Sequence, residues 1–154
     1  MYEKIVVPLD GSKVGEAALP YVEDLVSKLS SEVKVEVILL QVLAPEVVHR
    51  VAGEATVPLH YTEKEMEQST AKAMAYLNNI GGNLRSKGHT VVTKVVVGDA
   101  SEQIVKVAEE TNANLIAMST HGRSGLSRWA FGSVTDKVLR REGRIPVAMV
   151  RAPK

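Results

Sequence analysis

The stretch from Leu115 to Thr135 reads LIAMSTHGRSGLSRWAFGSVT. Its first four residues are apolar, as expected of a buried strand, and its end runs into a segment with helical spacing. Between them lie Gly122, Gly125 and Gly132, where the missing Cβ lets main-chain N–H groups approach a ligand closely. A helix start after Gly132 adds unpaired N–H donors and the positive end of a helix dipole. The stretch predicts a strand-to-helix loop that binds an anion, although such loops also serve as plain turns.

Four side chains of this stretch could contact the anion. Ser133 and Thr135 bring hydroxyl donors, and Arg123 brings positive charge. His121 has an unperturbed pKa of about 6.5, so it could hydrogen-bond a phosphate or act as an acid or base. We favour an orienting or loop-stabilising role for His121, because the sequence identifies no carboxylate or nucleophile beside it.

Two common phosphate-binding motifs do not occur in the chain. No Gly-Lys-Ser or Gly-Lys-Thr is present, which excludes a Walker loop, and the dinucleotide pattern G-x-G-x-x-G does not occur either. What remains is Gly122, nine residues, and then Gly132-Ser133, with the small residue Ser119 three positions before Gly122.

This spacing resembles the nucleotide-binding signature of the universal stress protein family, G-x2-G-x9-G-[ST]. Gly122, Gly132 and Ser133 match the signature, and Ser119 stands in place of its first glycine. The resemblance extends to the start of the chain, where residues 2–12 (YEKIVVPLDGS) are similar to the family's first strand and its Pro-x-Asp turn. The segments VVVGDA at 95–100 and PVAMV at 146–150 look like later family strands. The chain is identified as a member of the family over essentially its whole length, as one domain spanning 1–154.

The resemblance implies a site for an adenine nucleotide, namely ATP, with Mg²⁺ or Mn²⁺ as an optional companion. The residues that it assigns to this site are Pro8, Leu9, Asp10, Val42, Gly98, Met118, Ser119, His121, Gly122, Arg123, Gly132, Ser133, Val134 and Thr135. By the same resemblance, Val42 and Met118 flank the adenine, and Val42 offers backbone hydrogen bonds; both are also ordinary core residues. Asp10 could accept hydrogen bonds from the ribose or coordinate a metal, or it could simply form the turn in Asp-Gly-Ser.

Composition limits the other classes of function. The chain has 154 residues, 45% of them apolar, a formal net charge of +1 and no cysteine. Such a balance gives no overall attraction to nucleic acid, and the lack of cysteine excludes disulfides and thiolate catalysis. No window reads as a membrane span or a signal peptide, so we expect a cytoplasmic protein that binds no membrane.

Strand-like and helix-like segments alternate along the chain. We expect strands over 5–9, 33–42, 90–97, 115–118 and 146–151, and helices over 13–29, 62–87, 101–110 and 133–141. In the first helix, Ser12 is the expected N-cap and Pro20 should produce a kink. The segment Leu43–Tyr61 follows no period, which predicts an irregular excursion, either a lid or a disordered loop.

This alternation predicts an α/β protein with a single open, doubly wound, Rossmann-like parallel sheet. We expect five strands in the order 3-2-1-4-5, with helices on both faces. In such sheets ligands bind beyond the carboxyl ends of the strands, where the strand order reverses. The turn at Pro8–Asp10 and the glycine loop would be neighbours at that crevice.

The last strand would lie at a sheet edge, and an apolar edge invites pairing with another chain. Universal stress proteins commonly dimerise through this strand, so the resemblance implies a homodimer formed by Pro146–Arg151. Three classes of function follow: an ATP-binding stress-response regulator whose downstream partner is unknown, a slow metal-dependent ATPase, or a dimeric interaction module that binds no nucleotide. The ATPase is disfavoured because no Walker lysine, arginine finger or general base can be identified. The module without nucleotide is disfavoured because Gly122, Gly132 and Ser133 all remain, so the regulator leads.

Overall fold

The computed structural model describes residues 2–49, 57–120, 133–141 and 143–153. The elements in chain order are β1 (Tyr2–Pro8), η1 (Gly15–Ala17), α1 (Ala18–Ser27), β2 (Lys34–Leu43), β3 (Glu46–His49), β4 (Val57–His60), α2 (Glu63–Ser86), β5 (Thr90–Val97), α3 (Ala100–Glu110), β6 (Leu115–Thr120), α4 (Ser133–Arg140) and β7 (Val147–Arg151).

The main sheet has five parallel strands in the order β5-β2-β1-β6-β7. Numbered among themselves along the chain, these strands stand in the order 3-2-1-4-5, so the expected fold is confirmed. The central strand β1 pairs with β2 on one side and β6 on the other, so that Val6 lies opposite both Ile38 and Ile116. A parallel sheet covered on both faces buries nearly continuous apolar strands, which is what the run Ile5–Leu9 provides.

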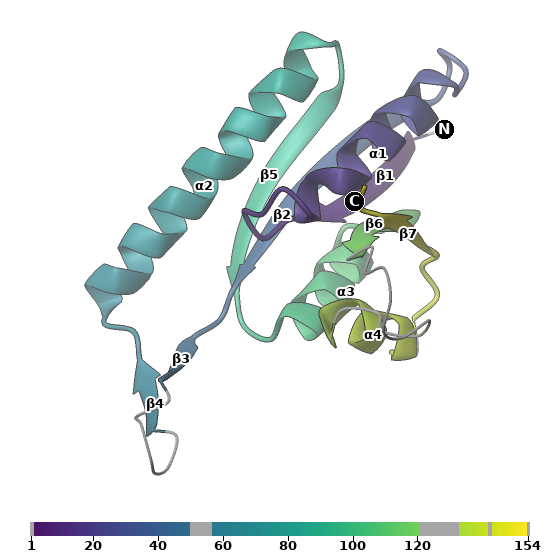
Figure 1. Cartoon of the computed structure of the whole chain (residues 1–154). Helices are drawn as coiled ribbons and strands as arrows, with labels where there is room; N and C mark the ends of the chain where they lie inside the picture. The colour runs from purple at the N-terminus through teal and green to yellow at the C-terminus, as the bar shows by residue number, and fades with distance from the viewer. Residues whose placement is uncertain (1, 50–56, 121–132, 142, 154) are drawn as a thin grey trace.

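Helices cover both faces of this sheet, as Figure 1 shows. Residues of α1 and α2, such as Val22 and Leu77, pack with Val7 and Leu39 in one core cluster. Residues of α3 and α4 pack with the alternate strand residues in a second cluster. The alternation of strand side chains therefore divides the core into two layers, and the face that a strand residue occupies follows from its register.

The segment after β1 differs from the sequence prediction. Instead of a helix from residue 13, the chain forms a polar turn, the short 3₁₀ helix η1 and then α1 from Ala18. Ser12 is not the N-cap of α1, because its side chain is used within the turn, where its Oγ accepts a hydrogen bond from Gly15 N. Pro20 is the third residue of α1, in the first turn, where a helix leaves N–H groups unpaired and a proline needs no kink.

The segment between β2 and α2 is also more regular than expected. β3 and β4 form a two-stranded antiparallel sheet that projects away from the main sheet (Figure 1). The prediction of an irregular excursion is therefore wrong at 46–49 and 57–60, while 50–56 lies outside the described residues. Pro58 obscured the pattern in the sequence, but a sheet of two strands has only edges, where proline is tolerated.

β1 begins at Tyr2, three residues before its predicted start, and the remaining elements begin and end within two residues of their predicted bounds. α2 starts with a capping box, in which Thr62 Oγ1 accepts from Glu65 N and Glu65 Oε2 accepts from Thr62 N. Within the described part of the chain, none of the helices combines the length and the apolar character that a bilayer crossing requires.

Candidate functional site

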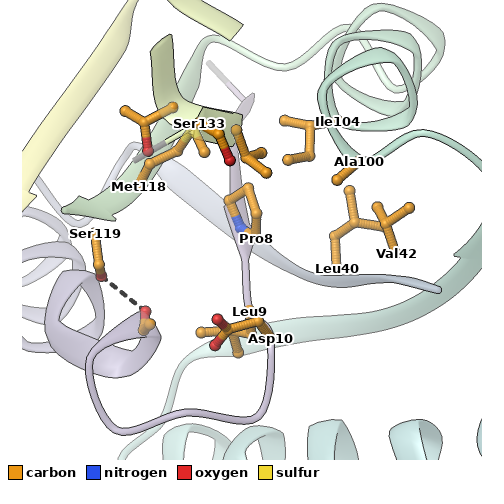
Figure 2. A pocket seen from close by; sticks show the side chains of 13 residues that line it. Pro8, Leu9, Asp10, Leu40, Val42, Ala100, Ile104, Met118, Ser119 and Ser133 are labelled. Carbon is orange, nitrogen blue, oxygen red and sulfur yellow. Dashed lines mark hydrogen bonds between the residues drawn. The ribbon is translucent and has the colours of Figure 1, made fainter. Parts of the chain in front are cut away.

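A cavity of about 260 Å³ opens at the carboxyl end of the main sheet. Figure 2 shows the side chains around it, which come from β1, β2, β6, α3 and α4 and from the turn after β1. The residues that line it are Pro8, Leu9, Asp10, Gly15, Leu40, Val42, Ala100, Ile104, Met118, Ser119, Ser133, Val134 and Thr135.

The strand order explains the position of this cavity. The connection after β1 leads to β2 on one side, while the later strands β6 and β7 lie on the other side. The chain therefore leaves the sheet in opposite directions at β1 and β6, which opens a crevice at their carboxyl ends. Pro8 and Met118, at these two strand ends, both line the cavity.

One wall of the cavity is apolar. Leu40 and Val42 stand two residues apart on β2 and therefore share the sheet face covered by α3. Ile104 of α3 and Met118 of β6 complete the wall, and both are buried. Such a surface can accept a flat, apolar ring system.

The backbone of Val42 faces the open end of β1. Leu9 N donates to Leu40 O at 2.8 Å, so the carbonyl of residue 40 points toward β1, and the backbone groups of residue 42 point the same way. The paired part of β1 ends where Pro8 lies opposite Leu40. The N–H and C=O of Val42 thus face the space beyond β1 rather than a neighbouring strand.

The opposite side of the cavity is polar and is built by the turn after β1. Gly11 has a positive φ of 84°, which favours glycine at that position of the turn. Asp10 Oδ1 accepts hydrogen bonds from Ser12 N at 2.9 Å and from Ser12 Oγ at 2.6 Å. Gly15 closes the turn, and a Cβ there would stand 2.5 Å from Asp10 Oδ1.

Ser119 ties this turn to the end of β6. Its Oγ donates to Gly15 O at 2.7 Å and accepts from Ala18 N at 2.8 Å. The bond to Gly15 is the dashed line in Figure 2. The hydroxyl that replaces the motif's first glycine is therefore bound to the backbone at the start of η1 and at the start of α1.

Two helices begin at the cavity. α3 starts at Ala100 after the N-cap Asp99, and α4 starts at Ser133. Hydrogen bonds from Ser101 Oγ and Glu102 N hold the pKa of the Asp99 carboxyl below its ordinary value. The positive ends of two helix dipoles face one opening, which is an arrangement that favours an anionic ligand.

Most of the residues assigned from the sequence meet at this cavity. Those that line it are Pro8, Leu9, Asp10, Val42, Met118, Ser119, Ser133, Val134 and Thr135. Gly98 does not line it; Gly98 N donates to Leu43 O, and its φ of 150° suits glycine. His121, Gly122, Arg123 and Gly132 lie outside the described residues.

Four lining residues were not assigned from the sequence: Gly15, Leu40, Ala100 and Ile104. Leu40 could have been found, because it precedes Val42 by two positions and must share its face of the sheet. Ala100 and Ile104 are helix residues with no chemical signature, and only the packing of α3 brings them to the cavity.

The described lining offers limited means to hold a metal ion. Asp10 is the single carboxylate among the described residues that line the cavity. No group of three or more acidic or histidine side chains is assembled within the described part of the chain. A single carboxylate suits an ion that is also held by ligand phosphates, as Mg²⁺ commonly is. It does not suit a metal site formed by protein side chains alone.

A comparison with protein-family models matches residues 1–151 to the universal stress protein family. The chain belongs to the universal stress protein family. Its sequence is 32% identical over 160 residues to the universal stress protein MJ0577 of Methanocaldococcus jannaschii, covering 98% of this chain and 96% of that protein. The solved structure of MJ0577 superposes with a TM-score of 0.73 at 29% identity, covering 100% of this chain and 99% of the other.

More distant family structures share the fold and were solved with nucleotides. A universal stress protein in complex with cAMP has a TM-score of 0.66 at 22% identity and covers 97% of both chains. A family protein from Arabidopsis thaliana with AMP bound has a TM-score of 0.64 at 15% identity, covering 98% of this chain and 92% of that one. These universal stress proteins carry the same α/β architecture as the present chain.

Proposed function

We propose that this universal stress protein binds an adenine nucleotide, ATP in the first place, in the cavity at the end of β1 and β6. The observation that carries the proposal is the division of the cavity into an apolar wall and a polar side. The apolar wall suits a purine, while the carboxylate of Asp10 and two helix N-termini suit a sugar and phosphates.

The geometry supports a definite orientation of the nucleotide. Adenine packs between Val42 and Met118, and the backbone of Val42, which faces the open end of β1, exchanges hydrogen bonds with its edge. The ribose lies against Asp10, and the phosphates extend toward the start of α4 at Ser133 and Thr135. The motif glycines Gly122 and Gly132 complete the phosphate side in this proposal.

A divalent cation fits this arrangement as a companion of the nucleotide. Asp10 would hold the ion together with the phosphates, and the ion would neutralise phosphate charge. The chain's own residues then bind and orient the nucleotide, and ATP hydrolysis is not part of the proposal.

We also propose that the protein acts in the cytoplasm as a homodimeric regulator whose partner surface depends on the bound nucleotide. β7 is the edge of the main sheet, and its Met149 is 36% exposed. An exposed apolar side chain on an edge strand suits pairing with a second copy of the strand. The family structures solved with cAMP and AMP support an adenine nucleotide as the signal.

The test is to fill the cavity from its wall. The protein and its Ala100→Phe variant are purified from cells and denatured. The supernatants are then analysed for adenine nucleotides by chromatography. Both are also freed of ligand and titrated with ATP. The parent should release or bind nucleotide, and Ala100→Phe should bind at least about tenfold more weakly, because the phenyl ring occupies space meant for the ligand.

Ala75→Phe is the matched control, since Ala75 is exposed on α2 and does not line the cavity. It should bind ATP like the parent. The proposal is wrong if the parent neither carries nor binds ATP, ADP or AMP, or if Ala100→Phe binds ATP as tightly as Ala75→Phe.

A further inference from the structure

We propose that Ser119 is a positioning residue for the sugar of the nucleotide. Its hydroxyl holds the turn between β1 and α1 in place. That turn orients the carboxylate of Asp10 toward the cavity. The inference rests on the proposed function and assigns a distinct role to the one residue that departs from the family motif.

The direction of the Ser119 side chain follows from the register of β6. Ala117 packs in the core cluster that contains α1, and Met118 packs in the cluster that contains α3. Side chains alternate along a strand, so Ser119 faces the same side as Ala117 and meets η1 and α1. A Cβ at position 119 therefore leaves the sheet on the face opposite the side chain of Met118, which explains why serine is tolerated where the motif has glycine.

The hydroxyl of Ser119 makes two hydrogen bonds that a glycine could not make. It donates to Gly15 O at 2.7 Å and accepts from Ala18 N at 2.8 Å. These partners are the first residues of η1 and of α1, and they lie more than 100 positions away in sequence. Both bonds are partly buried, so the turn after β1 is held to β6 at two adjoining points.

The position of Gly15 determines that of Asp10. Gly15 N donates to Ser12 Oγ at 3.0 Å, and the same Oγ donates to Asp10 Oδ1 at 2.6 Å. The Cα of Gly15 packs so closely that a Cβ on it would stand 2.5 Å from Oδ1. Displacement of Gly15 would therefore displace the carboxylate.

This network engages one oxygen of Asp10 and leaves the other for a ligand. Oδ1 accepts both hydrogen bonds from Ser12, while Oδ2 accepts none from the part of the chain that the structure describes. A carboxylate oxygen that is held in a fixed orientation but receives no hydrogen bond from the protein can accept hydrogen bonds from sugar hydroxyls. Ser119 thus acts on the sugar through Gly15 and Ser12.

The test compares ATP with 2′,3′-dideoxy-ATP, which lacks the hydroxyls that Asp10 would bind. The parent should bind ATP about tenfold more tightly or better, the ratio expected from a hydrogen bond to a charged group. Ser119→Ala and Ser119→Gly should reduce this ratio to less than about threefold, while their affinity for the dideoxy nucleotide stays at the parent value. Asp10→Asn should reduce the ratio as well. Ser119→Thr, which keeps the hydroxyl, should retain the ratio.

Two further variants separate an effect on the network from a loss of folding. Thr111→Ala removes a hydroxyl that bonds to backbone carbonyls at the far end of α3, and it should leave the ratio unchanged. If Ser119→Ala does not fold, Ser12→Ala in the exposed turn breaks the same network and should reduce the ratio.

The possible outcomes separate this inference from the proposed function. A parent that binds no adenine nucleotide overturns both. A parent that binds ATP and dideoxy-ATP equally, or a Ser119→Ala variant that folds and keeps the parent ratio, overturns the positioning role and leaves nucleotide binding intact.

Discussion

Tyr76 lies on α2, yet its hydroxyl reaches the turn that carries the site. It donates to Glu16 Oε1 at 3.0 Å, one residue beyond Gly15. Burial, this hydrogen bond and the nearby charges of Glu16 and Asp10 raise the pKa of the Tyr76 phenol above its ordinary 10.0. Together with Ser119, Tyr76 holds η1 from a second side.

The shifted pKa of Tyr76 predicts a loss of stability in alkali. The folded state keeps the phenol protonated where the unfolded state already ionises it, so the stabilisation is fully present below about pH 10 and declines as the pH rises toward the folded pKa. Tyr76→Phe has no such proton. Its free energy of unfolding, measured in urea at pH 8 and pH 10.5, should fall less between the two conditions than that of the parent. An equal fall in both proteins would contradict this assignment.

At the scale of elements, the capping box at the start of α2 gives a measurable contribution. Thr62→Ala removes the side-chain acceptor of Glu65 N and should lower the free energy of unfolding by about 1 kcal/mol. Ser86→Ala, at the exposed end of the same helix, should change it by no more than about 0.5 kcal/mol. Urea denaturation of the two variants and the parent gives these free energies of unfolding. Similar decreases from both substitutions would argue against a stabilising cap.

Elements with a clear apolar period were predicted well, because the burial of one face determines where apolar residues recur along the chain. β5 has its expected bounds, and α2 ends within a residue of them. A turn after β1 was expected, but its continuation through η1 in place of the helix over 13–17 was not, since Asp10, Ser12 and Gly15 hydrogen-bond to one another locally and so compete with the helix. The β3–β4 pairing depends on contacts between two short segments, which a period within one segment cannot reveal.

In the molecule as a whole, the strand order contributed most to predicting where the candidate site lies. The turn at Pro8–Asp10 and Ser119 are more than 100 positions apart in the sequence, and the strand order 3-2-1-4-5 brings them to the same end of the sheet. Ile104 was missed, because a residue that lines a cavity and a residue that fills a core look alike in a sequence; Leu40 was missed although its spacing to Val42 places both on one face of the sheet.

The exposed edge of β7 supports a direct test of the proposed homodimer. Met149→Glu places a charge on the exposed part of this edge and should yield monomers by light scattering, because a carboxylate cannot be buried unpaired against a second strand. Met149 suits the test better than Val147, which packs against the core and whose replacement would also disturb the fold. A dimer that persists in a folded Met149→Glu variant would place the interface elsewhere.

Methyl NMR tests whether an adenine nucleotide occupies the cavity between β1, β2 and β6. With isoleucine and methionine methyl groups labelled, ATP is added to ligand-free protein. The signals of Ile104 and Met118, which line the cavity, should shift in step with saturation, and that of Ile80, packed on the opposite face of the sheet, should not. Binding of ATP that leaves the Ile104 and Met118 signals unshifted, or no binding at all, would show that this cavity is not a nucleotide site.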